Sequence, residues 1–451
     1  MDNYRPISLT CISCKVMESI IRNKIMEFFT YNNLFSNKQF GFIKGRSTVL
    51  QLLNVCDEWT KLLENKGQID IIYTDLEKAF DKVPHRRLLS KLYSYGIGLQ
   101  LIEWIEAFLC TRMQRVRINS DLSDCKPVLS GIPQGSVLGP LLFVIFINDM
   151  PLECVNNCES FLFADDAKLY KQIFCEMDSS VLNKCCQNVF DWCSTWLMKV
   201  NISKCKVLSI AHNKNDITTY DYGFSVPDAG FIKLEHVESI SDLGVLMDSG
   251  LTFVNHIYEK INVAYKMLGI INRNFKHLDK SSLLLLYKSL VRSQVEFAHS
   301  VWSPYKKGLI YDIEKVQKRA TKMVQGCKNK GYRERLELLQ LPTLHYRRLR
   351  GDMIEVFKII HGHYDPTVVP SLVRNANSRT RGNSFKLRVD GCNYDLRKFS
   401  FCNRVISTWN SLPDYVVCSC SLNSFKNGLD KFWEKEDFLY DYEAVLSASI
   451  H

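Results

Sequence analysis

The chain has 451 residues, which at about 150 residues per domain predicts roughly three domains. Apolar residues make up 46% and charged residues 24%, which excludes a largely disordered or collagen-like chain. The longest apolar run, at 141–147, is far shorter than the ~18 residues of a membrane span, and the first residues lack a secretory signal pattern. Seventeen cysteines without such a signal favour reduced thiols and an intracellular protein, in the cytoplasm or the nucleus.

The net charge of +10 is distributed unevenly. Residues 1–250 hold 26 basic and 29 acidic residues, whereas residues 260–410 hold 29 basic and 11 acidic ones. An excess of +18 in one section predicts a polyanionic partner for that section. The alternative is a solvated basic surface on helices.

Apolar periodicity predicts alternating helices and strands over the first 250 residues. Helices are predicted at 14–35, 48–65, 86–110, 137–148 and 178–198. Strands are predicted at 69–75, 115–118, 128–129, 161–164, 168–170 and 205–211, with a strand pair within 231–247. The polar, turn-rich residues 212–230 are interpreted as an insertion.

The remaining chain is predicted to be mostly helical. Helical spacing continues from about residue 254 to 365 and is interrupted at Ser303-Pro304. Residues 366–410 are expected to be loop-rich and basic, and a short helix is expected at 422–436.

Three aspartates stand in unusual settings. Asp75 ends an otherwise apolar strand, and Asp165-Asp166 lie at the tip of an apolar hairpin. A buried carboxylate is costly unless it is paired or bound to a metal ion, and carboxylate oxygens suit Mg²⁺. If the two strand ends meet, they could share two divalent cations, as polymerases and nucleases do. Two adjacent aspartates by themselves are more often a simple turn.

The surroundings of these aspartates resemble the reverse transcriptases of non-LTR retrotransposons of the jockey or CR1-like kind. The matching stretches are, in chain order, NYRPISL at 3–9, QFGF with KGRST at 39–48, DLEKAFD at 75–81, GIPQGS with GP at 131–140, FADD at 163–166, Asn201 with Lys204, and LGV at 243–245. Residues 254–410 and WNSLP at 409–413 are also similar to the family's thumb and downstream region.

The resemblance implies an α+β, right-hand polymerase fold. Fingers and palm, with an antiparallel sheet and packed helices, would span 1–250, and a helical thumb 251–325. A basic nucleic-acid-binding region would span 326–451. The implied activity is RNA-directed DNA synthesis, with an RNA template, a DNA primer or target, and dNTPs as partners and no membrane.

The resemblance also implies metal-binding and catalytic roles. Asp75, Asp165, Asp166 and the carbonyl of Leu76 would hold two Mg²⁺ ions, with Mn²⁺ as an alternative. Lys204 would donate a proton to the leaving pyrophosphate, although any lysine placed before a strand could look the same.

The nucleotide would be held by residues of three motifs. Phe80 would exclude a 2′-hydroxyl, with core packing as its alternative role. Gln134 and Gly135 would form a tight turn beside the nucleotide. Lys44 and Arg46 would reach the triphosphate, with solvent exposure as the alternative.

Basic residues of the later chain would grip the template–primer through its phosphates, independently of base sequence. The candidates are Arg347, Arg348, Arg350, Arg379 and Arg381.

The chain also departs from the family's pattern, because the endonuclease and the early finger segments of full-length elements do not precede residue 1. We therefore expect an N-terminally truncated copy. This leaves a catalytically silent remnant that only binds nucleic acid as the alternative to an active polymerase. A viral-type RNA-directed RNA polymerase is a third reading, against which Phe80 and the FADD motif argue.

Overall fold

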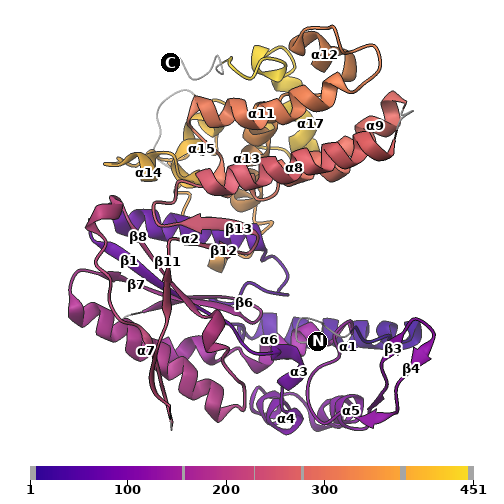
Figure 1. The fold of residues 1–451 in the computed structure, drawn as a ribbon, viewed down its shortest axis with the longest axis vertical. Helices are drawn as coiled ribbons and strands as arrows, with labels where there is room; N and C mark the ends of the chain where they lie inside the picture. Colours follow the sequence, from indigo (N-terminus) through magenta and orange to yellow (C-terminus); the bar gives the residue numbers. More distant parts are fainter. Residues whose placement is uncertain (1–6, 155–157, 228, 276–278, 376–381, 445–451) are drawn as a thin grey trace. The chain divides into compact units, whose positions relative to one another are not determined.

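The computed structural model describes residues 7–154, 158–227, 229–275, 279–375 and 382–444 (Figure 1). Contacts divide the chain into two compact units. Unit 1 comprises residues 1–48, 67–210 and 215–237, and unit 2 comprises residues 49–66, 211–214 and 238–451. This division differs from the predicted boundary at residue 250, because residues 49–66 and 238–250 pack with the later chain. The assignment of fingers, palm, thumb and C-terminal region stays a prediction.

A five-stranded sheet forms the centre of unit 1, with the strand order β11-β8-β1-β7-β6. The strands are β1 (Gln68–Thr74), β6 (Glu159–Phe163), β7 (Asp166–Ile173), β8 (Lys206–Ala211) and β11 (Glu235–Val237). β7 pairs antiparallel with both β1 and β6, whereas β11 runs parallel to β8. β1 lies in the middle of the sheet and is almost entirely buried, as its apolar run predicts.

Helices cover this sheet and enclose the core of unit 1. They are α1 (Ile12–Tyr31), α3 (Ala79–Lys82), α4 (His85–Ser94), α5 (Leu99–Cys110), α6 (Gly139–Phe146) and α7 (Glu176–Thr195). Seven of the eight residues of α6 are buried, so this helix lies at the centre of the apolar core. α7 packs along β7.

Short hairpins complete unit 1. They are β2 (Met113–Gln114) with β5 (Lys126–Pro127), β3 (Arg117–Ile118) with β4 (Asp121–Leu122), and β9 (Gly223–Val226) with β10 (Gly230–Lys233). The residues of β2 to β5 are exposed.

Unit 2 is mainly helical. Its helices are α2 (Thr48–Leu63), α8 (Val254–Asn274), α9 (Lys280–Leu286), α10 (His299–Trp302), α11 (Lys307–Lys322), α12 (Tyr332–Leu339), α13 (Leu344–Ile360), α14 (Asp395–Lys398), α15 (Phe401–Asn410), α16 (Asp414–Val417) and α17 (Leu422–Phe432). A hairpin of β12 (Ser239–Asp242) and β13 (Val245–Asp248) packs against α8. α13 is central, since α10, α11, α15 and α17 all pack against it. Across the described residues, every helix is too short or too polar to cross a bilayer.

The sequence placed most elements correctly, with four corrections. The strand predicted at 128–129 does not form, since β5 ends at Pro127, and of the strand predicted at 115–118 only β3 is paired. The helix predicted at 86–110 is two helices, because Gly96 adopts a left-handed φ of 86° that ends α4. The segment 212–230 is not only an insertion, since β9 lies within it. The segment 366–410 is not loop throughout, because its last ten residues form α15, which buries Val405 and Trp409.

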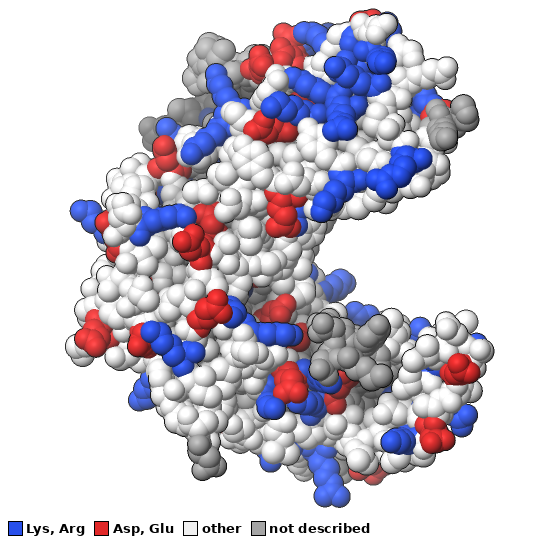
Figure 2. All heavy atoms as spheres, in the orientation of Figure 1, with Lys and Arg blue, Asp and Glu red and all other residues white. Residues whose placement is uncertain are grey.

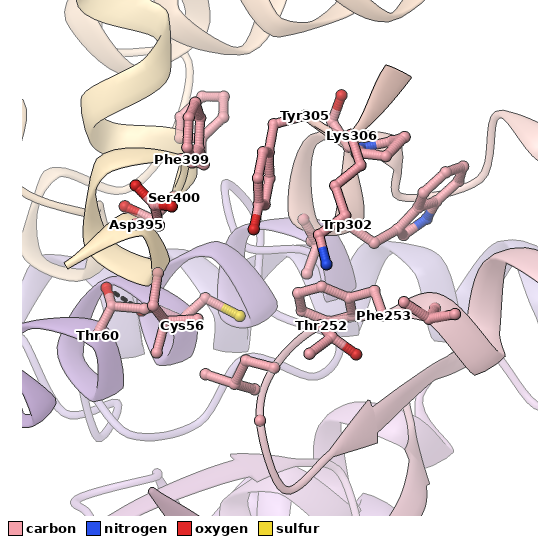
Figure 3. A pocket seen from close by; sticks show the side chains of 18 of the residues that line it. Cys56, Thr60, Thr252, Phe253, Trp302, Tyr305, Lys306, Asp395, Phe399 and Ser400 are labelled. Atoms are coloured by element: carbon pink, nitrogen blue, oxygen red, sulfur yellow. Dashed lines mark hydrogen bonds between the residues drawn. The ribbon is translucent and has the colours of Figure 1, made fainter. Parts of the chain in front are cut away.

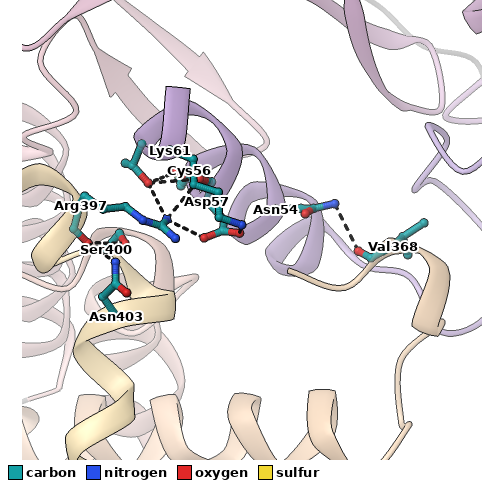
Figure 4. A network of polar contacts seen from close by, with 9 residues as sticks. Asn54, Cys56, Asp57, Lys61, Val368, Arg397, Ser400 and Asn403 are labelled. Atoms are coloured by element: carbon teal, nitrogen blue, oxygen red, sulfur yellow. Dashed lines mark hydrogen bonds and ion pairs between the residues drawn. The ribbon is translucent and has the colours of Figure 1, made fainter. Parts of the chain in front are cut away.

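A buried ion pair ties α14 to α2 within unit 2 (Figure 4). Arg397 Nη1 donates to Asp57 Oδ1 at 2.6 Å and to Thr60 Oγ1 at 3.0 Å, and Lys61 Nζ donates to Asp57 Oδ2 at 2.6 Å. Burial raises the pKa of the Asp57 carboxyl, but the hydrogen bonds from Lys61 and Arg397 hold that pKa below its ordinary value. The carboxylate is therefore charged and paired in the folded chain.

We expect Arg397→Met to lower the free energy of unfolding by about 1.5–3 kcal/mol, because it removes the charged hydrogen bond of Arg397 to the buried Asp57 carboxylate and leaves Lys61 as the cation beside it. Urea unfolding at pH 7 measures this.

Because the folded-state pKa of Asp57 is depressed, the stabilisation should be present above about pH 3.9 and should disappear as the pH falls below that value. Arg388→Met removes an exposed pair with Asp390 and should cost less than about 1 kcal/mol. Equal losses in the two variants would contradict the argument.

Candidate active site

The sheet brings the three predicted aspartates to one end of its strands, where β1 stops and β6 turns into β7. We call this end of the strands the sheet edge. β1 ends at Thr74, which lies opposite Ala167 of β7, so Asp75 follows directly at the position opposite Asp166. β6 and β7 are joined by the two-residue turn Ala164-Asp165. Asp75 and the distant pair Asp165-Asp166 therefore occupy neighbouring positions where β1 ends and the β6–β7 hairpin turns.

A second segment, residues 199–205, holds the chain just after β1. Asn201 N donates to Asp75 O at 2.8 Å, and Glu77 N donates to Lys199 O at 2.8 Å, on either side of a bridge between Leu76 and Val200. In such an antiparallel bridge the flanking residues make the hydrogen bonds, so the Leu76 carbonyl points away from Val200.

The side chains at this edge suit a hard divalent cation. The donor oxygens would come from carboxylates and one main-chain carbonyl, which is the ligand type that Mg²⁺ prefers. Lys204 Nζ lies 3.8 Å from Asp75 Oδ2, so a cationic group already approaches this carboxylate. Within the described residues, however, no three His, Cys, Asp or Glu side chains gather as a ready-made metal site. The shared edge, rather than a closed ligand cage, is what the structure shows.

Phe80 lies five residues after Asp75, in α3. Its ring stacks on Phe143 at 4.2 Å between centroids and meets Phe42 edge-on at 6.3 Å. The ring is half-buried: it packs against the core, and part of it remains exposed.

The loop with the GIPQGS motif is bound to α3. Ile132 N donates to Phe80 O at 2.7 Å, and Gln134 Nε2 donates to Asp81 Oδ1 at 2.9 Å. Gly135 has a φ of 102°, which agrees with the tight turn predicted there. The side chain of Gln134 thus orients the loop through Asp81.

Lys44 and Arg46 have different surroundings. Arg46 Nη1 donates to the carbonyls of Ser36 and Gln39, each at 2.6 Å, so its guanidinium holds the loop in which it lies. Lys44 is exposed.

The arginines predicted to bind phosphates in the later chain take part in the packing of unit 2. Arg347 pairs with both carboxylate oxygens of Glu296, and Arg350 pairs in the same way with Asp430. Arg348 is only 2% exposed, so the structure does not place it where a phosphate could reach it. Arg379 and Arg381, like residues 3–6 of the first motif, lie outside the described residues.

Other basic side chains of unit 2 are accessible. Figure 2 shows Lys and Arg side chains gathered over α8, α11 and α12. The exposed members on the two packed helices α8 and α11 are Lys266, Arg273, Lys307, Lys315, Arg319 and Lys322. We call these six residues the basic helix face.

Sequence reasoning missed two buried residues that support the site. Glu18 of α1 is fully buried, and its Oε2 accepts from the main-chain N–H groups of Val137 and Leu138 at 2.7 and 3.0 Å, just before α6. Gln39 is fully buried against the turn that carries Asp165. Gln39 is the first residue of the QFGF motif, so the sequence does mark it as a candidate site residue. Nothing in the sequence links Glu18 to residues more than a hundred positions later.

Unit 2 also contains a cavity of about 210 Å³ beside the stacked rings of Tyr305 and Phe399, whose centroids are 4.0 Å apart (Figure 3). Leu53 and Cys56 of α2 and Trp302 line other walls. It contains none of the residues predicted for the active site, and those residues lie instead at the sheet edge of unit 1.

Comparison with known proteins gives the same assignment as the motifs. The family model described as "Reverse transcriptase (RNA-dependent DNA polymerase)" matches residues 1–247. The chain is 27% identical over 354 residues to a probable RNA-directed DNA polymerase from transposon BS, and 28% identical over 337 residues to that from transposon X-element, both of Drosophila melanogaster. The RNA-directed DNA polymerase from mobile element jockey of the same organism is 27% identical over 339 residues. Each match covers 72% of this chain and 36% of the relative, so the chain spans about a third of the length of these relatives.

Among solved structures, apo telomerase from Candida tropicalis, truncated from its C-terminal domain, matches with a TM-score of 0.38 and 9% sequence identity. The match covers 52% of this chain and 44% of the telomerase chain.

We expect Gly131→Ala to destabilise unit 1 by about 1–3 kcal/mol. Gly131 has a φ of 90°, and a Cβ there would lie 2.5 Å from Asp81 O, where main chain cannot yield. Gly98→Ala is the matched control, because a Cβ at Gly98 meets nothing within 4 Å. Thermal unfolding of the two variants checks this, and a stable Gly131→Ala variant would show that the loop does not need the left-handed conformation.

Proposed function

Because the chain belongs to the reverse transcriptase (RNA-dependent DNA polymerase) family, we propose that it extends a DNA primer with dNTPs on an RNA template, as the polymerase of a non-LTR retrotransposon. The observation that carries this proposal is the meeting of Asp75, Asp165 and Asp166 at one sheet edge, beside Lys204. We assign fingers and palm to residues 1–250, the thumb to 251–325 and a nucleic-acid-binding region to 326–451.

Reverse transcriptases use divalent metal ions, and we propose two Mg²⁺ ions here, with Mn²⁺ as a substitute. Asp75, Asp165, Asp166 and the Leu76 carbonyl would hold them. When bound, such ions lower the pKa of the attacking primer hydroxyl and neutralise the charge of the leaving pyrophosphate. The contribution of the chain is to place these oxygens on two paired strand ends and one turn, where the sheet restricts their movement.

The other residues bind and orient the substrates. Lys204 would donate a proton to the leaving pyrophosphate, since its ammonium lies at the edge beside Asp75. Exposed Lys44 would contact the triphosphate, and Arg46 would hold the loop that presents Lys44. Gln134 and Gly135 would form the turn against which the nucleotide packs.

The template–primer would lie against the basic helix face rather than on Arg347, Arg348 and Arg350. Those three side chains are buried or paired with carboxylates, whereas the basic helix face is exposed. Contacts of lysine and arginine with phosphates carry no sequence information, so binding should weaken steeply with added salt.

We expect Asp165→Ala to lose essentially all primer extension on poly(rA) with oligo(dT), dTTP and Mg²⁺, because a proposed metal ligand is removed. Asp191→Ala, an exposed residue of α7, is the control and should extend like the wild type. Extension by Asp165→Ala at the wild-type rate would place the chemistry elsewhere. A folded wild type that binds primer–template without extending it would instead favour the silent remnant.

We expect Phe80→Val to incorporate ribonucleotides at least about tenfold better relative to deoxynucleotides, because the smaller side chain leaves room for a 2′-hydroxyl. Primer extension with UTP and dTTP, each at several concentrations, gives the ratio of kcat/KM for the two substrates. Thermal unfolding must accompany this measurement, since the ring also packs on Phe143. An unchanged ratio in a folded variant would assign Phe80 to the core alone.

A further inference from the structure

The turn that carries Asp165 is held by a side chain from a distant loop. Gln39 is fully buried. Its Oε1 accepts from Ala164 N at 2.9 Å, and its Nε2 donates to Ala164 O at 3.3 Å. The amide of one glutamine thus pairs with both main-chain polar groups of the residue before Asp165.

The turn needs such a partner. Ala164 has a φ of 53°, a left-handed conformation that costs an alanine about 1 kcal/mol or more. Because it lies in the turn, its main-chain groups are outside the regular ladder between β6 and β7. Gln39 supplies the donor and the acceptor that a neighbouring strand would otherwise provide.

The main chain around Gln39 is itself anchored to β6. Phe40 N donates to Leu162 O and Leu162 N donates to Lys38 O, each at 2.8 Å. Arg46 Nη1 donates to the Gln39 carbonyl at 2.6 Å. Gln39 therefore acts from a fixed position.

Gly41 closes this arrangement from the other side. Its N–H donates to Gln39 Oε1 at 2.7 Å, and a Cβ at this position would lie 2.4 Å from Ala164 N. Only glycine allows the loop to approach the turn this closely. The QFGF motif thus contains both Gln39, which binds the turn, and Gly41, whose missing Cβ leaves room for the turn.

We propose that Gln39 is a positioning residue for catalysis: its amide fixes the conformation of the Ala164-Asp165 turn and so sets the direction in which Asp165 presents its carboxylate. This inference rests on the proposed polymerase function. We call the pairing of the Gln39 amide with Ala164 N and Ala164 O the clamp. A displacement of about 1 Å at a reacting centre can cost about 100-fold in rate, so the loss of the clamp should affect turnover more than nucleotide binding.

The same unit contains a matched control. Gln68 is also buried, at 5% exposure, and its amide likewise pairs with both polar groups of one main-chain residue: Oε1 accepts from Thr218 N at 2.7 Å and Nε2 donates to Thr218 O at 2.8 Å. Its Nε2 also donates to Asp70 Oδ1 at 2.8 Å. Gln68 begins β1, whereas Asp75 follows its last residue. The two glutamines therefore make the same kind of contact, Gln68 at the start of β1 and Gln39 at the β6–β7 turn, beyond the other end of β1.

The experiment compares Gln39→Leu with Gln68→Leu in the full chain. Both variants should unfold at lower temperatures than the wild type. We expect kcat for dTTP incorporation to fall about 10- to 100-fold in Gln39→Leu, with KM for dTTP within about threefold and a raised half-saturating Mg²⁺ concentration. We expect Gln68→Leu to keep kcat within about threefold of the wild type. Equal kcat losses in both variants, or a wild-type kcat in Gln39→Leu, would overturn the proposal.

A conservative variant separates positioning from folding. Gln39→Glu keeps the acceptor for Ala164 N and Gly41 N, but as a carboxylate it repels Ala164 O. Protonation restores the donor, so the kcat of Gln39→Glu relative to the wild type should rise as the pH falls from 8 to 6. A ratio independent of pH would show that the contact with Ala164 O does not matter.

Hydrogen exchange tests the clamp without relying on activity. The Ala164 amide should exchange about tenfold faster or more in Gln39→Leu than in Gln68→Leu, because only the first variant removes its acceptor. If the wild type does not extend primers, the proposed function fails while this exchange result still decides whether the clamp exists. Equal exchange in the two variants would refute the clamp itself.

Discussion

The active-site arrangement depends on the antiparallel register between β1 and β7. Asp75 has no neighbour in the sequence that could bring it to Asp165 and Asp166, and the pairing of Thr74 with Ala167 does so. Side chains alternate between the faces of a sheet, so a slip of one residue would turn Asp75 to the other face. The register is secured by the difference between the two faces of buried β1: Ile69 and Ile71 point to one face, whereas Gln68 and Asp70 on the other face bind Thr218 and Tyr222.

The elements around this edge limit its movement, and one of them also carries Lys204. Residues 199–205 bridge to Leu76, and the loop with the GIPQGS motif is bound to α3 through Phe80 O and Asp81. Gln39 pairs with the turn from the other side. Preorganisation of this kind reduces the conformational entropy that substrate binding would otherwise have to remove.

Unit 2 uses its charges in two ways. Arg397 and Arg404 pair with the buried carboxylates of Asp57 and Asp352, and Arg347 pairs with Glu296, so many basic residues stabilise helix packing. The basic helix face on α8 and α11 remains exposed. A count of basic residues cannot separate these groups, because the excess of +18 in residues 260–410 includes both.

The sequence by itself determined the family, the order of helices and strands, and the aspartates that follow β1 and stand at the β6–β7 turn. These follow from local patterns: apolar periodicity marks the elements, and a carboxylate at the end of an apolar strand stands out against it. It did not separate α4 from α5 or detect α15. A glycine can lie within a helix or end one, and a stretch with several polar residues can be a helix or a loop, so the local pattern does not decide between them. Only the tertiary structure decided that Arg348 is buried, that Arg46 holds its own loop, and that Gln39 and Glu18 bind main-chain groups more than a hundred residues away. The physical reason is that hydrogen-bond and ion-pair partners are chosen by proximity in the folded chain, and sequence spacing carries no record of that proximity.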